Sequence, residues 1–143
     1  MKEQKWCELK VESSLKNLEV IGDFIAETMH NFGIEDIKDI FDVQLSVDEA
    51  CTNVIEHAYS GKEDGLIWVK CGLSESKKEF IVKIIDSGKP FNPDAVQTPN
   101  TEAKLDEQKR GGFGIFIMKQ KMQSIKYAFS DKGNELTMIK LLH

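Results

Sequence analysis

The sequence predicts an α+β sandwich, in which helices cover one face of a mixed, mostly antiparallel sheet. Two observations support this fold class. Apolar residues recur at helical spacing in the longer segments, while shorter segments alternate apolar and polar residues as strands do. These segments follow the order β-α-α-β-β-loop-α-β-β. Strands that follow one another directly favour antiparallel pairing, which leaves the helices together on one side of the sheet.

In the first half of the chain, one strand and two helices are expected. Their ranges are Trp6–Val11 for the strand, Leu15–Phe32 for the first helix, and from near Asp36 or Asp39 to about Tyr59 for the second. Ser13 and Ser14 are candidates to cap the start of the first helix, and Gly33 suits the position just after its end. Ser60-Gly61 is a stop signal for the second helix.

In the second half, four strands surround one long loop and one helix. The expected strands are Leu66–Leu73, Glu79–Ile85, Ile125–Phe129 and Glu135–Leu142, and a helix is expected from Gly114 to about Met122. The loop contains three prolines and the charged stretch Glu102–Arg110. A loop of this length in a small domain is usually functional, so residues 93–110 are predicted to form a lid.

Composition limits the class of protein. With 143 residues, 41% of them hydrophobic and 30% charged, the chain predicts one folded domain over 1–143. The net charge of −5 argues against a nucleic-acid partner. Apolar runs are too short to cross a membrane, and no signal peptide is predicted, so we expect a cytoplasmic protein. Cys7, Cys51 and Cys71 lack metal-ligand spacing and are expected to be reduced thiols.

The second helix carries a polar face that two interpretations explain. Val47, Cys51, Val54 and Ala58 form its apolar stripe, and the opposite side carries Glu49, Asn53, Glu56, His57 and Ser60. An ordinary solvated surface is one interpretation. The other is a functional pair one turn apart, in which the Glu49 carboxylate accepts a proton and the Asn53 amide oxygen holds a hard cation such as Mg²⁺.

Two glycine-containing turns also allow a structural or a functional interpretation. Asp86-Ser87-Gly88 is a plain turn, or a site where Asp86 accepts a hydrogen bond from an exocyclic amine and Gly88 lets a ring approach. Residues 110–114, Arg-Gly-Gly-Phe-Gly, open a helix whose free N–H groups and dipole attract anions such as phosphate. Arg110 is the only arginine in the chain, and arginine binds phosphate bidentately.

Taken together, Glu49-x-x-x-Asn53, Asp86-x-Gly88 and Gly112-x-Gly114 resemble the N, G1 and G2 boxes of the GHKL ATPase superfamily. The segments Glu49–Tyr59 and Asp86–Pro93 look most like the stand-alone anti-sigma factor serine-protein kinases of the RsbW and SpoIIAB type. This resemblance implies the Bergerat fold and a Mg²⁺-ATP-dependent serine kinase that phosphorylates an STAS-type antagonist protein.

The resemblance also implies a role for each site residue. Glu49 would be the general base, and Asn53 would ligate Mg²⁺. Asp86 would bind the adenine amine, with Gly88 beneath the ring. The glycine loop, with Arg110, Gly111, Gly112 and Gly114, would hold the phosphates, and 93–110 would be the ATP lid. His57 is as consistent with a structural hydrogen bond as with ligand contact.

Some features depart from the family pattern. Pro90 stands where many relatives have glycine, and Thr137 is only a weak match to their late threonine. Sigma-binding relatives use an arginine on the first helix, and Leu15–Phe32 has none, so a sigma-factor partner is in doubt. The sequence leaves open whether the chain forms a homodimer. A nucleotide-responsive binding module without kinase activity is the alternative function.

Overall fold

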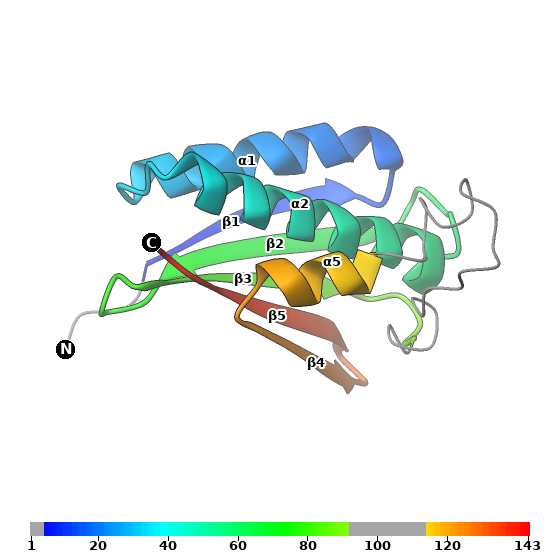
Figure 1. Ribbon diagram of the computed structural model, residues 1–143. Coiled ribbons are helices and arrows are strands. Elements are labelled where there is room, and N and C mark those ends of the chain that lie inside the picture. The colour runs from blue at the N-terminus through cyan, green and yellow to red at the C-terminus, as the bar shows by residue number, and fades with distance from the viewer. Residues whose placement is uncertain (1–4, 92–113) are drawn as a thin grey trace, which may run out of the picture.

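The computed structural model describes residues 5–91 and 114–143, and they form a five-stranded antiparallel sheet in the order β1-β2-β3-β5-β4. The helices cover one face of this sheet (Figure 1). The strands are β1 (Trp6–Glu12), β2 (Leu66–Leu73), β3 (Glu79–Asp86), β4 (Ser124–Ser130) and β5 (Gly133–Leu141), and the α-helices are α1 (Leu18–Asn31), α2 (Ile37–Asn53) and α5 (Gly114–Lys121). The predicted fold class and element order are confirmed.

The ends of α1 match the sequence signals only in part. A 3₁₀ turn, Leu15–Asn17, precedes the helix, and neither Ser13 nor Ser14 caps it with its side chain. The Ser13 hydroxyl instead donates to the Lys62 carbonyl at 2.6 Å, tying this turn to the loop before β2. Ser14 stands at the N-cap position of the 3₁₀ turn, but neither serine makes the capping hydrogen bond, because the Ser13 hydroxyl donates to Lys62 and the Ser14 hydroxyl to Glu63. The prediction for Gly33 is confirmed: its φ of +86° and the bond from the Ile34 N–H to the Met29 carbonyl close the helix.

The second helix begins as expected and ends with a change of winding. The Asp36 side chain accepts the Asp39 N–H at 2.9 Å and so caps α2. After Asn53 the chain continues as a π-helical segment, Val54–Ala58, before a stop at Ser60 and Gly61. A single regular helix was expected over this range. Segments of π-helix are rare and frequently occur at functional sites.

The core lies between the helix layer and one face of the sheet. The predicted stripe of α2 is buried as expected, since Val47 and Cys51 are both 0% exposed. The strands alternate, so that Phe80, Val82 and Ile84 of β3 face the helices. Burying such a side chain stabilises the fold by about 1.5–3 kcal/mol. The packing of α2 against the sheet therefore fixes where its last turn lies relative to the end of β3.

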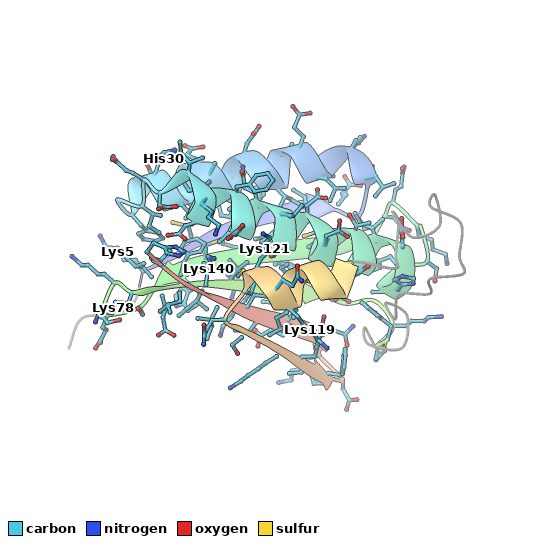
Figure 2. All side chains as sticks on the ribbon, viewed as in Figure 1. Lys5, His30, Lys78, Lys119, Lys121 and Lys140 are labelled. Carbon is cyan, nitrogen blue, oxygen red and sulfur yellow. The ribbon has the colours of Figure 1, made fainter. Side chains whose placement is uncertain are left out.

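A buried ionic cluster joins the C-terminal strand to the helices. The Lys140 ammonium of β5 lies 2.9 Å from the Asp42 carboxylate of α2 and donates to the Lys121 carbonyl of α5 at 3.1 Å. Figure 2 shows Lys121 and Lys140 close together where these elements meet. Asp39, one turn before Asp42, binds both the backbone N–H and the imidazole of His143.

The three cysteines are free thiols, as expected. Cys51 and Cys71 are buried, Cys7 is half-buried, and none of the three forms a disulfide. Burial raises the pKa of the Cys51 and Cys71 thiols, which keeps them protonated and unreactive. Among the described residues, no helix has the length and apolarity needed to cross a membrane.

Candidate nucleotide-binding site

Asp86 is the last residue of β3, and it is buried, with only 3% of its surface exposed. Its Oδ1 accepts two hydrogen bonds, from the Gly88 N–H at 2.9 Å and from the Asn134 Nδ2 at 2.8 Å. Among the described residues, no group donates to its Oδ2. The two donors therefore fix the carboxylate and leave its second oxygen able to accept a hydrogen bond from a ligand.

Two opposing effects act on the pKa of the Asp86 carboxyl. Burial raises the pKa of this carboxyl, and the hydrogen bonds from Asn134 and Gly88 partly oppose the rise. An ionised, acceptor-only carboxylate is the form that an exocyclic amine requires. The two hydrogen bonds thus favour the ionised form of Asp86, against the larger effect of burial.

Asn134 is the site residue that sequence reasoning missed. It lies on β5 directly opposite Asp86 and is 4% exposed. Besides Asp86, its Nδ2 donates to the Gly88 carbonyl at 3.0 Å, so one amide holds both ends of the turn after β3. The only signal was its place in the Gly133-Asn134 turn, which also fits an ordinary hairpin residue.

Gly88 is required by the protein itself. A Cβ at this position would lie 2.4 Å from the Ala58 carbonyl oxygen, at the end of the π-helical segment. The same oxygen accepts the Lys89 N–H at 2.9 Å. The Tyr59 hydroxyl accepts the Ser87 N–H at 2.8 Å and holds the turn from the other side. The close approach expected at Gly88 is therefore made by Ala58, and contact with a ligand ring stays a prediction.

A narrow pocket with about 20 Å³ of free space lies between the end of α2 and the strands β3, β4 and β5 and opens to solvent. Its walls are mostly apolar, with polar groups at a few places, which is typical of a small-molecule site. The apolar part includes aromatic rings from the loop after β3 and from β4, and the polar part brings Asn53, Asp86 and Asn134 together; the lining residues are Ala50, Asn53, Val54, Ile84, Asp86, Phe91, Tyr127, Phe129, Asn134, Glu135 and Leu136.

Asn53 differs from the solvated polar face that was one interpretation of the helix. It is the last residue of α2 and only 3% exposed. The helical wheel placed it opposite the core, but the wall of the pocket covers that side of the helix. Asn53 therefore faces the pocket, which supports the functional interpretation over the surface one.

Glu49 lies one turn before Asn53 but is not among the residues that line the pocket. It is half-buried, and burial raises the pKa of its carboxyl, with further contributions from the nearby carboxylates of Asp48 and Glu56. A carboxylate with a raised pKa is a better proton acceptor, which suits a general base. The structure thus places Glu49 one helical turn from the pocket residue Asn53 and leaves its catalytic role a prediction.

The remaining candidates divide between the pocket and the opposite face. The His57 ring lies 5.6 Å from the ring of Phe91, a pocket residue, so His57 borders the site. Thr137 pairs with Lys83 and Lys126 on the sheet face away from the helices and does not line the pocket. Gly114 opens α5 as expected. Arg110, Gly111, Gly112 and the predicted lid, 93–110, lie outside the described residues.

Comparison with known proteins identifies the class. Residues 11–140 match the model of the histidine kinase-like ATPase domain. The match covers most of the chain, and the chain belongs to this family. The predicted resemblance to GHKL ATPases is therefore confirmed.

Individual relatives show which kinases of this family the chain resembles. The chain is 35% identical over 109 residues to the serine-protein kinase RsbW of Bacillus velezensis, covering 73% of this chain and 66% of the relative. It is 36% identical over 108 residues to RsbW of Halalkalibacterium halodurans, covering 73% of this chain and 64% of that one. It is 29% identical to the serine/threonine-protein kinase BtrW of Bordetella bronchiseptica, covering 68% of each. The chain thus spans about two thirds of the length of these relatives.

Solved structures support the fold. The histidine kinase domain of a blue-light activated histidine kinase from Erythrobacter litoralis matches with a TM-score of 0.53 at 17% identity, covering 90% of this chain and 60% of that one. The catalytic domain of the histidine kinase ThkA matches with a TM-score of 0.51 at 13% identity, covering 96% and 97%. At these identities the similarity shows a shared fold.

Proposed function

We propose that this chain is a cytoplasmic, Mg²⁺-ATP-dependent serine-protein kinase of the RsbW type, which phosphorylates a serine of an STAS-domain antagonist protein. The observation that carries the proposal is the convergence of Asn53, Asp86 and Asn134 on one mostly apolar pocket. Asp86 would accept the adenine amine through Oδ2. The apolar walls would hold the ring of the base.

The residues present fit a magnesium ion. Mg²⁺ prefers oxygen ligands and usually binds through one or two protein groups together with substrate phosphates. The Asn53 amide at the end of α2 would supply such a ligand without adding charge. When bound, the ion neutralises charge on the phosphates. Glu49 would accept the proton of the partner's serine hydroxyl while the γ-phosphoryl group passes to the serine oxygen and ADP leaves.

Two variants test this proposal. Glu49→Gln keeps the size of the side chain but removes the proton acceptor, so phosphotransfer should fall by about 10²–10⁴-fold while ATP affinity changes only a few-fold. Asn53→Ala should weaken both binding and transfer. Glu27→Gln, an exposed change of the same kind on α1, is the matched control. The measurements are calorimetry with Mg²⁺-ATP and transfer of labelled phosphate to a purified STAS protein.

The outcomes separate this function from its alternative. A wild-type chain that binds ATP but transfers nothing would favour a nucleotide-responsive binding module. Glu49 does not line the pocket, and this observation supports the second function. If Glu49→Gln and Asn53→Ala both bind and transfer like wild type, the kinase proposal is refuted.

A further inference from the structure

The outer face of α2 exposes apolar side chains at helical spacing. Ile37 is 83% exposed and Phe41, one turn later, is 57% exposed, while Leu45 follows after another turn and is half-buried. These three residues form an outer row on the side of the helix that faces away from the core residue Val47. Exposed apolar side chains that lie together, rather than singly, mark interaction surfaces.

Helix α1 lies beside α2 in the layer that covers the sheet, and the two helices run in opposite directions (Figure 1). The Gln44 side-chain amide donates to the Gly22 carbonyl at 2.9 Å and fixes their alignment. Because the helices are antiparallel, Phe41 lies beside the turn of α1 that follows Gly22. A Cβ at Gly22 would meet no atom within 4 Å, so this part of the surface has room for a partner's side chain.

The exposed face of α1 is acidic. Glu19, Asp23 and Glu27 recur at every fourth position and are all exposed, which makes an acidic row along the helix. None of the three forms an ion pair with another described residue. Helix α1 contains no lysine or arginine, and α2 contains one lysine, Lys38. The outer row is therefore flanked by negative charge that the neighbouring helices leave uncompensated.

We propose that the outer row and the acidic row together bind a basic amphipathic helix of a partner protein. Such a helix lays apolar anchors, spaced three or four residues apart, on an apolar surface. The anchors would meet Ile37, Phe41 and Leu45, and the lysine or arginine side of the bound helix would lie over α1. The net charge of −5 favours the approach of a cationic segment. An anionic membrane surface would suit the apolar row but would be repelled by the acidic row.

This surface is separate from the candidate nucleotide site. None of the residues of the outer row or of the acidic row lines the pocket. The proposal therefore does not depend on ATP binding or on kinase activity. The bound helix and the Phe41→Ser change described next should each alter the affinity for ATP by no more than a few-fold.

A synthetic peptide tests the chemistry of the partner against the full chain. The probe is a fluorescent peptide about five helical turns long, with leucines on one face and lysines on the other. One control peptide has the same composition in a shuffled order that destroys the apolar face. In a second control, every lysine is replaced by glutamate. Fluorescence anisotropy at physiological salt should show binding of the first peptide alone.

Variants of the chain locate the site. Phe41→Ser removes the aromatic anchor and should raise the dissociation constant about tenfold. Asp23→Lys should weaken binding several-fold and reduce its dependence on salt. Leu141→Ser, a similar change at a 50% exposed residue of β5, and Glu8→Lys, the same charge reversal on β1, are the matched controls and should bind like wild type. Circular dichroism checks that each variant is folded.

Amide NMR shifts give an independent location. On addition of the basic peptide, they should concentrate at residues 19–27 and 37–45. Shifts concentrated at the pocket or on the open face of the sheet would overturn the proposal. So would a wild-type chain that binds none of the peptides or binds the shuffled peptide equally well, and so would a Phe41→Ser chain that binds like wild type. If Phe41→Ser instead changes the sedimentation of the chain alone, a second copy covers the outer row and the proposal is wrong.

Discussion

Replacing Asn134 with alanine should weaken both the fold and nucleotide binding. The change removes a 2.8 Å hydrogen bond to the buried Asp86 carboxylate and a 3.0 Å bond to the Gly88 carbonyl. A hydrogen bond to a charged group contributes about 1.5–3 kcal/mol, and an unsatisfied buried carbonyl costs about 1–3 kcal/mol. Since water entering the pocket would replace part of both, we expect a loss of about 2–4 kcal/mol in the free energy of unfolding.

The pH dependence of this loss gives the sharper test. Burial already raises the pKa of Asp86, and losing the Asn134 donor should raise it further. A carboxyl with a raised folded-state pKa contributes stability at low pH that is lost as pH rises through that pKa. The difference between Asn134→Ala and wild type should therefore be largest near neutral pH and shrink on acidification.

The assays are urea unfolding at several pH values and calorimetry with ATP. Asn134→Ala should bind ATP more weakly, and its affinity should recover as pH rises because Asp86 again ionises. Asn134→Asp should be worse than alanine, because two carboxylates at this distance cannot both ionise. An Asn134→Ala protein that unfolds and binds ATP like wild type at neutral pH would refute the reasoning.

Three further changes have distinct expected outcomes. Asp86→Asn should raise the melting temperature near neutral pH, because it removes a buried charge whose pKa is raised, and should weaken ATP binding about tenfold or more. Lys140→Met removes the 2.9 Å partner of the buried Asp42 carboxylate and leaves it only Lys121, 3.7 Å away, so it should cost up to about 3 kcal/mol in urea unfolding. Gly88→Ala would drive a Cβ into the Ala58 carbonyl oxygen and should lower stability by about 1–3 kcal/mol and reduce ATP affinity, both measurable by thermal shift with and without nucleotide.

The fold could be predicted because its signals are local. Alternation in Glu79–Asp86 and helical spacing in α2 are each visible within a few turns of the chain. The π-helical segment Val54–Ala58 has no such signature. Its sequence continues the same apolar spacing, and its last residue, Ala58, contacts the turn at Gly88.

Sequence reasoning selected residues of the candidate site only where a residue type was unusual for its position in its own segment. Asp86 at the end of an apolar strand and Asn53 in a helix are of this kind. Asn134 is not, because its importance arises from the register that sets β5 opposite β3. That pairing joins residues far apart in the sequence, and no spacing within either strand reports it.

Three acidic residues near the C-terminal ends of α2 and β3 are unfavourable for the stability of the fold. Burial raises the pKa of Asp48, Glu49 and Asp86, so each of these carboxylates lowers stability near neutral pH. A fold under no functional demand would place neutral or apolar groups there. These unfavourable carboxylates lie near the C-terminal ends of α2 and β3. In the first half of α2, by contrast, the buried Asp42 carboxylate is paired with the Lys140 ammonium. Among the described residues, no cation pairs with these three carboxylates, and we propose that a bound ligand or metal ion supplies a partner to Asp86, the one of the three that lines the pocket.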